Sequence, residues 1–400
     1  MTEFDDLADE MATLLGAPCT VEDPDFHLVA YSGQSGGDTV RQRSIMERRA
    51  TVEVRDWFHS HGIRESPVPV RTPREPDLGI EARLCIPARH HNRVQGYFWL
   101  LDPEAQIPDD LLPAAQAIAE VGALLLSQST RRQTRHNLFY RELIDGDRAS
   151  ARRAARELAS SAGFPTDTPV TCVLVRRSSS AGRSAALPHG DAALWLEESS
   201  DVDAVIVRGA LSSRATSPEL VLGQLGSPRS CQSTDRASVV AVGPTVESLE
   251  EVRQSRWGAL TTLRVAEGTV GAGHVTRWND LGVLRLLAAA ADEDLGTAVF
   301  SGPLRAFVSD PRQRQLRQTA RAYLDNAGSV ARTATELSVH RQTLYHRLAQ
   351  VEHATGFDIK DGQDRLQLHL ALSLAAFLAS ADGADGEHAR LPRFEGDQSA

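Results

Sequence analysis

The sequence has few cysteines and lacks the spacing of metal sites and disulfide scaffolds and the basic, then apolar, start of a signal peptide. Its four cysteines, Cys19, Cys85, Cys172 and Cys231, have the spacing of neither a metal site nor a disulfide framework. The apolar stretch near the C-terminus, Leu366–Ala379, is shorter than the about 20 residues that a membrane span requires. The first residues, MTEFDDLADE, are acidic where a signal peptide would be basic and then apolar. We therefore expect a cytoplasmic protein with reduced, mostly buried thiols and no membrane anchor.

Motifs of catalysis and metal binding are also missing. We find no Gly-rich phosphate loop, no Ser/His/Asp spacing and no pair of carboxylates in a recognisable catalytic setting. The histidines His59, His61, His90 and His91 are adjacent or alternate in sequence, which does not direct them to one ion, so we expect surface residues. The sequence indicates no enzyme, no cofactor and no metal site.

The chain does have enough apolar content for several cores. With 400 residues, of which 41% are hydrophobic, we expect two to four domains in a multidomain fold of α/β and all-α parts. Residues 1–127 are typical of an α/β unit that ends in a long helix, Asp109–Gln128. Its other expected elements are a short N-terminal helix, strands around Thr20-Val21 and at Phe26–Tyr31, a helical stretch from about Asp38 to Phe58, and a hairpin of Arg83–Ala88 and Val94–Leu101.

The aromatic residues of this first unit leave two interpretations open. Phe26, Tyr31, Tyr97, Phe98 and Trp99 could line a small-molecule pocket, because aromatic side chains often wall such cavities. They could equally belong to the core, which the alternation along the expected strands favours.

The middle of the chain predicts a helical linker at residues 128–168 and a second α/β domain at residues 169–310. In that domain, short β-rich runs alternate with helical stretches, a pattern typical of βαβ packing. The segments are Val170–Val175, Ala204–Arg208 and Ser238–Gly243 as strands and Val246–Leu260 as a helix. Residues 176–190 and 381–400 have too little apolar content to pack, so we expect a mobile loop and a disordered tail.

The charge of the chain is unevenly distributed. The formal net charge of −10 argues against a nucleic-acid partner, because phosphate contacts need concentrated positive charge. Between Arg312 and Gln350, however, there are seven arginines against two acidic residues. Lys360 is the only lysine of the whole chain, and the heavy use of Arg, Ala and Gly is typical of a GC-rich genome. The local excess of positive charge is compatible with nucleic acid.

Residues 311–380 predict a helical domain that begins with three capped helices. Asp310-Pro311 begins the first helix, Asn326-Ala327-Gly328 ends it, Ser329 caps the second, and His340 opens the third. The apolar residues recur at helical spacing: Leu316, Ala320, Tyr323 and Ala327 in the first helix, Val330, Ala334 and Leu337 in the second, and Leu344, Leu348 and Val351 in the third.

The second and third helices match the pattern of a helix-turn-helix. Such a unit needs a small residue where the helices cross, which Ala334 supplies, and an apolar residue in the turn, which Val339 supplies. Ser338 stands where many such turns have glycine, and this adds up to about 1 kcal/mol of backbone strain. The pattern therefore places the third helix where it can enter the major groove of DNA.

The remaining faces of the third helix carry side chains that suit DNA. Arg341 is suited to guanine, Gln342 to adenine, and Thr343 to a phosphate or a thymine methyl group. The alternative is an amphipathic helical bundle with a solvated arginine face, which fits any single arginine, whereas the caps, the turn and the local charge together favour DNA. The candidate DNA-binding residues are Arg332, His340, Arg341, Gln342, Thr343, Tyr345, His346 and Arg347.

The same segment resembles a known family. Leu316–Phe377 is similar to the C-terminal DNA-binding domain of the PucR/CdaR family of bacterial regulators, whose pattern VHRxTLxxRLxxVExxTG appears at Val339–Gly356 nearly without interruption. It also resembles the Fis-type helix-turn-helix, which implies DNA contacts by Arg341, Thr343 and His346 and a helix start at His340. Gln342 departs from the asparagine that is frequent in the family, so the sequence preference is expected to differ.

The resemblance extends upstream with less specific motifs. VEDPDFHLVAY at residues 21–31, the hairpin ending GYFWLLD and the helix after it look like the GAF-type sensor of the actinobacterial members. AVGPTVESLEEVRQSRWGAL resembles the family's GGDEF-like middle domain. Because residues 169–278 lack the Gly-Gly-acidic-acidic turn of a diguanylate cyclase, we expect this domain to be degenerate and catalytically silent.

Together, pattern and resemblance imply an effector-responsive homodimer that binds promoter DNA. One recognition helix contacts few base pairs, so specificity usually requires two half-sites about 34 Å apart. The stripe of Leu366, Leu370, Leu374 and Phe377 in the last helix is expected to pack on the recognition unit or to join the dimer interface. The alternatives are a nucleotide-handling enzyme and a protein-interaction scaffold with a vestigial helix-turn-helix.

Overall fold

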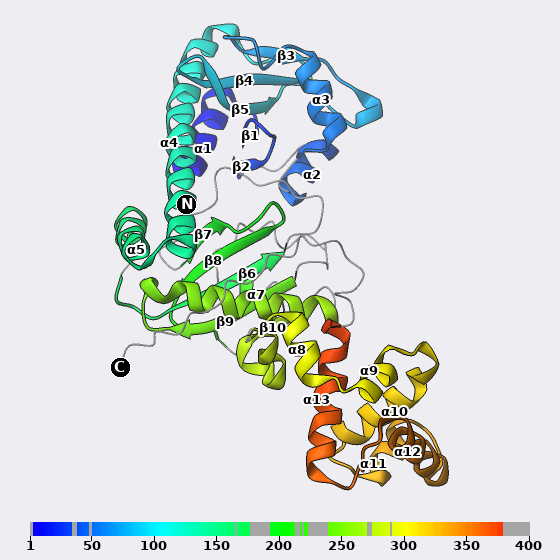
Figure 1. Ribbon diagram of the computed structural model, residues 1–400. Helices are drawn as coiled ribbons and strands as arrows, with labels where there is room; N and C mark the ends of the chain where they lie inside the picture. Colours follow the sequence, from blue (N-terminus) through cyan, green and yellow to red (C-terminus); the bar gives the residue numbers. More distant parts are fainter. Residues whose placement is uncertain are drawn as a thin grey trace. The chain divides into compact units, whose positions relative to one another are not determined.

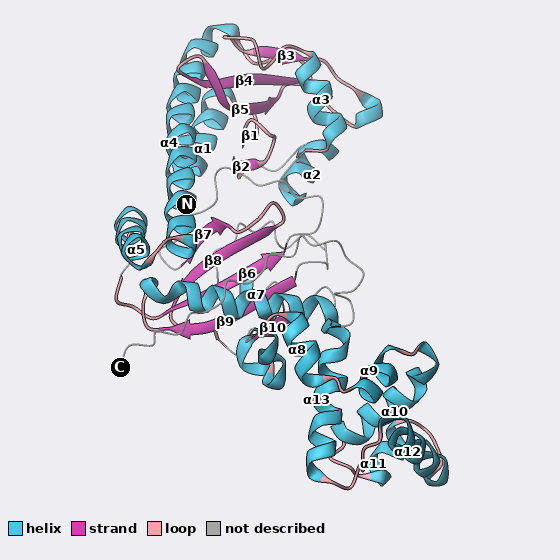
Figure 2. Ribbon diagram, viewed as in Figure 1, coloured by secondary structure: helices cyan, strands magenta, loops and turns pink. Residues whose placement is uncertain are grey.

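The structure, a computed structural model, combines helices and two sheets with a helical C-terminal part (Figures 1 and 2). It describes residues 3–33, 38–47, 50–164, 166–176, 193–212, 217, 220–222, 239–269, 274–288 and 290–378. The chain forms two compact units, residues 1–240 with 245–253 and residues 241–244 with 254–400. Cys231, the tail 381–400 and nearly all of the expected loop 176–190 lie outside the described residues.

The first sheet of unit 1 has five strands in the order β2-β1-β5-β4-β3. The expected hairpin is confirmed, with a tighter turn than predicted, because only His91 and Asn92 separate its strands and both have positive φ, 48° and 59°. The strands are β1 (Cys19–Glu22), β2 (Leu28–Tyr31), β3 (Val70–Thr72), β4 (Arg83–His90) and β5 (Arg93–Leu101). Short 3-10 helices lie at Pro76–Leu78 and Asp109–Leu111.

Helices α1 (Glu3–Leu15) and α4 (Leu112–Asp145) share one hydrophobic core with this sheet. Gly122 brings α4 against the sheet, because a Cβ there would lie 2.7 Å from the Phe98 ring. The helix does not end at the predicted Gln128 but continues to Asp145, through the segment expected to be a linker.

By length and composition, Asp109–Asp145 is the one helix among the described residues that could cross a membrane. Its alanines Ala115, Ala119 and Ala123 are buried in the core of the first sheet, as the residues of a core helix in a soluble domain are. Length and composition do not separate these two cases, so this helix is weak evidence for a membrane span.

The opposite face of the sheet carries a second core with α2 (Thr39–Glu47) and α3 (Val52–Ser60). The single helical stretch expected over residues 38–58 is thus two helices. Phe26, Tyr97 and Trp99 are buried here and Phe98 is buried on the other face, while Tyr31 is exposed. Of the two interpretations of these aromatic residues, the structure favours core. Phe26 itself precedes β2 in a turn with φ 64°, so it is not in the strand predicted at Phe26–Tyr31.

An ionisable side chain is buried in β1. Glu22 is 4% exposed, and burial raises its pKa to about 8, although the positive charge of Arg83 acts in the opposite direction. The folded state therefore holds this carboxyl group protonated at neutral pH, whereas the unfolded chain ionises it near 4.5.

The second sheet has the order β10-β9-β6-β8-β7, and the division between the two units passes along β9. β8 pairs antiparallel with both β6 and β7, so these three strands do not follow the expected βαβ pattern; a short turn joins β7 to β8. The strands are β6 (Val170–Arg176), β7 (Ala193–Glu197), β8 (Val202–Arg208), β9 (Val239–Val246) and β10 (Val275–Arg277). β7 was not predicted from the sequence.

Two further helices complete this region of the chain. α5 (Arg148–Ala162) begins at Asp147, whose carboxylate accepts from the backbone N–H of Ser150, and ends at Gly163 in the left-handed conformation. α7 (Val252–Thr269) begins six residues later than predicted, because a 3-10 turn, Leu249–Glu251, precedes it. Two more 3-10 segments follow β10, at Trp278–Asp280 and Gly282–Ala288.

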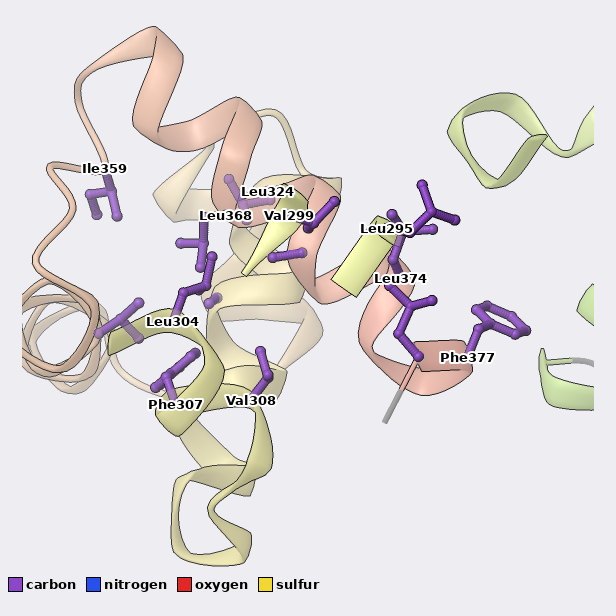
Figure 3. Packing of buried hydrophobic residues seen from close by; sticks show 14 of the residues in the cluster. Leu295, Val299, Leu304, Phe307, Val308, Leu324, Ile359, Leu368, Leu374 and Phe377 are labelled. Carbon is purple, nitrogen blue, oxygen red and sulfur yellow. The ribbon is translucent and has the colours of Figure 1, made fainter. Parts of the chain in front are cut away.

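Unit 2 is built around one helical core. α8 (Asp292–Val299), α9 (Gly302–Ser309) and α13 (Gly362–Leu378) contribute large apolar side chains that Figure 3 shows facing one another. In α13 the buried residues include Leu374 and Phe377, whereas Leu366 is 64% exposed. The predicted leucine stripe therefore packs inside the unit only in its C-terminal part.

We expect the burial of Glu22 to make the stability of the protein depend on pH. Since its pKa is raised by folding, its contribution is fully present below about pH 4.5 and is lost as the pH rises through about 8. As the pH rises from about 4.5 to about 8, the free energy of unfolding of Glu22→Gln should increase relative to that of the wild type, by up to about 1.4 kcal/mol per pH unit. Urea unfolding of both proteins between pH 4 and 9 measures the difference. Exposed Glu157→Gln is the matched control, and a constant difference for Glu22→Gln would contradict the prediction.

Candidate nucleic-acid interface

Three short helices form the candidate interface: α10 (Arg314–Asp325), α11 (Val330–Glu336) and α12 (Arg341–Thr355). Each start predicted from the sequence is confirmed. Asp310 accepts from the N–H of Arg312 at 2.9 Å ahead of a 3-10 turn, Pro311–Gln313, that leads into α10. The Ser329 hydroxyl accepts from the N–H of Arg332, and the Nδ1 atom of His340 accepts from the N–H of Gln342 at 3.3 Å. The helix ends are therefore fixed by local hydrogen bonds.

The turn between α11 and α12 is tight and strained. The N–H of Val339 donates to the carbonyl of Ala334 at 3.0 Å, which closes the turn directly behind α11. Ser338 has φ 52°, the left-handed conformation predicted for a position that usually holds glycine. Ala334 is buried, so its small side chain lets the two helices approach.

The buried sides of these helices agree with the predicted spacing, with one correction. Leu344, Leu348 and Val351 of α12 lie in the core of unit 2, as expected. Ala327 is exposed and not part of the buried face of α10, because the helix ends at Asp325 and the residues after it change direction. Leu324 is buried in its place.

The opposite side of α12 is open to solvent. Arg341, Gln342, Thr343, Tyr345 and His346 are all exposed, and among the described residues none of their side chains has a hydrogen-bond or ion-pair partner. Tyr345 is a large aromatic side chain that is 58% exposed. The helix thus presents a surface that is polar, aromatic and free to contact another molecule.

The other candidate residues differ in how much of the side chain is free. His340 is exposed, and its Nδ1 atom caps α12. Arg347 is half-buried. Arg332 is exposed but donates to the carbonyl of Asn326 at 2.7 Å, so it stabilises the turn between α10 and α11.

Some of the arginines between Arg312 and Gln350 make contacts inside the fold. Arg317 donates to the backbone carbonyls of Phe307 and Asp310, and Arg321 pairs with Asp325 at 2.9 Å. Within the described residues, the side chains of Arg312, Arg314, Arg341 and Arg347 have no such partner. The charge available to a ligand is therefore smaller than the sequence count indicates.

Some positioning residues were not predicted from the sequence. The Glu352 carboxylate accepts from the N–H of Ile359 at 3.2 Å and ties the end of α12 to the following loop. His369 of α13 bonds Asp325 at 2.9 Å, and Arg365 of α13 lies over the Tyr323 ring. Spacing alone gives no signal for these contacts, because the first joins a helix to a loop and the other two join α13 to α10.

Metal-ligating side chains do not cluster in the described part of the chain. No group of three or more His, Cys, Asp or Glu side chains there could hold a metal ion. The rings of His90 and His91 contact each other in a tilted arrangement at the tip of the β4–β5 hairpin, with centroids 4.0 Å apart.

We expect glycine at position 338 to relieve the strained turn. Ser338→Gly should stabilise the helix-turn-helix by up to about 1 kcal/mol, because glycine adopts positive φ without a Cβ clash. Amide hydrogen exchange in α11 and α12 should then slow by up to about fivefold. Ala331→Gly, which places glycine inside α11, should speed exchange by a similar factor. If Ser338→Gly speeds amide exchange as Ala331→Gly does, Ser338 is not strained.

The comparisons with known proteins agree with this geometry. Residues 316–374 match the family of PucR C-terminal helix-turn-helix domains. Over 398 residues the chain is 21% identical to the proline-responsive transcriptional activator PutR of Bacillus subtilis (strain 168), covering 93% of this chain and 96% of that protein. It is 22% identical to the DNA-binding transcriptional activator AdeR of the same organism over 402 residues, covering 93% of this chain and 92% of that protein.

Among solved structures, the regulator of polyketide synthase expression from Bifidobacterium adolescentis is similar at 18% identity, covering 61% of this chain and 98% of that one. Its TM-score of 0.28 is too low to support an argument about the fold. The family match falls on the three helices whose caps, turn and open surface are described above. Residues 316–374 are similar to the PucR C-terminal helix-turn-helix domain, and the chain is a DNA-binding transcriptional regulator.

Proposed function

We propose that α12 enters the major groove of promoter DNA and reads its sequence. The observation that carries the proposal is the open side of α12, where five adjacent polar and aromatic side chains have no partner among the described residues. Its other side is fixed in the core by Leu344, Leu348 and Val351, so the helix is held while its exposed surface stays free. A helix held in this way fits the width of the major groove.

The side chains at the start of α12 suit base edges. Arg341 can donate two hydrogen bonds to N7 and O6 of guanine, and Gln342 can pair with N6 and N7 of adenine. Thr343 suits a phosphate or a thymine methyl group. Tyr345 and His346, one turn later, reach the adjacent backbone or base edges.

The phosphate contacts come from residues at the borders of this surface. Arg347 lies between the exposed surface and the buried side of α12, and His340 stands at the N-terminus of the helix, where backbone N–H groups favour an anion. Arg332 can reach a phosphate with the donors that it does not use for Asn326. Arg312 and Arg314 are additional cations for the DNA backbone.

We also propose that the regulator is a cytoplasmic homodimer that responds to an effector. PutR is named a proline-responsive activator, and its similarity over nearly the whole chain supports an effector-responsive activator here. In this proposal residues 1–127 form a GAF-like sensor, 128–168 a helical linker, 169–310 a degenerate GGDEF-like domain without enzymatic activity, and 311–380 the DNA-binding domain. Two copies would supply the two recognition helices that a specific operator needs.

Arg341→Ala should lose specific DNA binding. We expect a loss of about 1–3 kcal/mol, on the order of 10- to 100-fold in Kd, and a relaxed preference at the base pair that Arg341 contacts. Promoter fragments recovered by chromatin immunoprecipitation with the wild type provide the probes for gel-shift titration. Arg148→Ala, which removes an exposed arginine from α5, is the matched control and should bind as the wild type does. Wild-type affinity of Arg341→Ala would reject the assignment.

Arg347→Ala should weaken binding to all DNA sequences similarly and make it less sensitive to salt. Removing one phosphate contact lowers the slope of log K against log salt by about 1. Titrations between 50 and 200 mM salt measure the slope, with Arg148→Ala again as the control. A scaffold with a vestigial helix-turn-helix would instead show weak binding with no dependence on Arg347.

A further inference from the structure

The outer side of α4 carries a row of apolar residues that nothing in the described structure covers. Ala114, Ala117, Val121 and Leu124 are all exposed, Val121 by 51% and Leu124 by 42%. They recur at alternating intervals of three and four residues, which places them in one stripe along the helix. The opposite side of α4 packs on the first sheet, so this stripe is available to a partner.

We propose that this α4 stripe, defined as Ala114, Ala117, Val121 and Leu124, binds the same stripe of a second copy in antiparallel orientation. The proposal rests on the dimeric regulator proposed above and names its interface. In a two-fold interface the same patch occurs on both subunits, so it must complement itself.

The sizes of the side chains fit an antiparallel pair. When the two helices run in opposite directions, Ala117 of one copy can lie opposite Val121 of the other, and Ala114 opposite Leu124. Each large side chain then meets a small one, and the two helices can approach closely. In a parallel pair large residues would meet large ones and alanines would meet alanines.

The charges beside the stripe favour the same orientation. Asp109, which pairs with Arg71 of its own chain at 2.8 Å, and Asp110 precede the stripe, and Arg131, Arg132 and Arg135 follow it, all exposed. In an antiparallel pair the arginines of each copy extend toward the acidic end of the other. In a parallel pair they would face the arginines of the second copy, which is unfavourable.

The first experiment measures the oligomeric state of the full chain. We expect the wild type to sediment as a dimer of the 43.4 kDa chain and the double variant Val121→Glu, Leu124→Glu to sediment as a monomer with an unchanged far-ultraviolet circular dichroism spectrum. The control introduces two glutamates at exposed valines elsewhere in unit 1, Val52→Glu and Val68→Glu, and should stay dimeric.

The outcomes separate this inference from the function on which it rests. A double variant that remains dimeric would overturn the α4 interface while the dimeric regulator stands. A monomeric wild type would overturn both. Wild-type binding to phosphatidylcholine vesicles that Val121→Glu, Leu124→Glu abolishes would assign the stripe to a lipid surface instead.

A second experiment tests the orientation. Ala114→Cys and Leu124→Cys proteins are prepared separately, mixed, and treated with a short bismaleimide. The antiparallel pair predicts a cross-link in the mixture and little in either protein alone, because Ala114 of one copy lies opposite Leu124 of the other. Cross-linking of each protein with itself would establish a parallel pair and overturn the proposed arrangement. Cys19, Cys85 and Cys172 are buried, and the unsubstituted chain controls for any reaction of the native thiols.

Discussion

The DNA-binding part of the molecule depends on one backbone contact, the hydrogen bond from the N–H of Val339 to the carbonyl of Ala334. It closes the turn that sets the angle between α11 and α12, and it requires Ser338 to accept a left-handed conformation. Once this angle is fixed, Leu344 and Leu348 enter the core of unit 2 and the opposite side of α12 must face solvent. The reading surface is thus a consequence of how the helix is anchored.

Much of this unit could be predicted from the sequence because its determinants are local. Asp310, Ser329 and His340 cap helices through contacts with residues two or three positions away, and the spacing of Leu344, Leu348 and Val351 follows from the helical repeat. Which arginines remain available could not be predicted. Arg317 is held by carbonyls that only tertiary packing brings near.

In unit 1 the hairpin was predicted, while the extent of α4, the two helices of residues 38–58 and strand β7 were not. A hairpin is recognisable from two apolar runs around a polar turn. The second half of α4 is rich in arginine and gives a weaker periodic signal, and it is held by contacts with β7, including a hydrogen bond from Gln133 to the carbonyl of Trp195 at 2.9 Å. Such contacts are decided by packing, so local spacing does not reveal them.

The uninterrupted course of α4 has a mechanical consequence. Its first half packs against the first sheet, and its second half is bonded to the end of β7, where Tyr140 also donates to Glu198 at 2.8 Å. Because α4 is continuous, it has no hinge between these two contacts. A small rotation of its first half about the helix axis therefore also rotates the second half, which contacts β7.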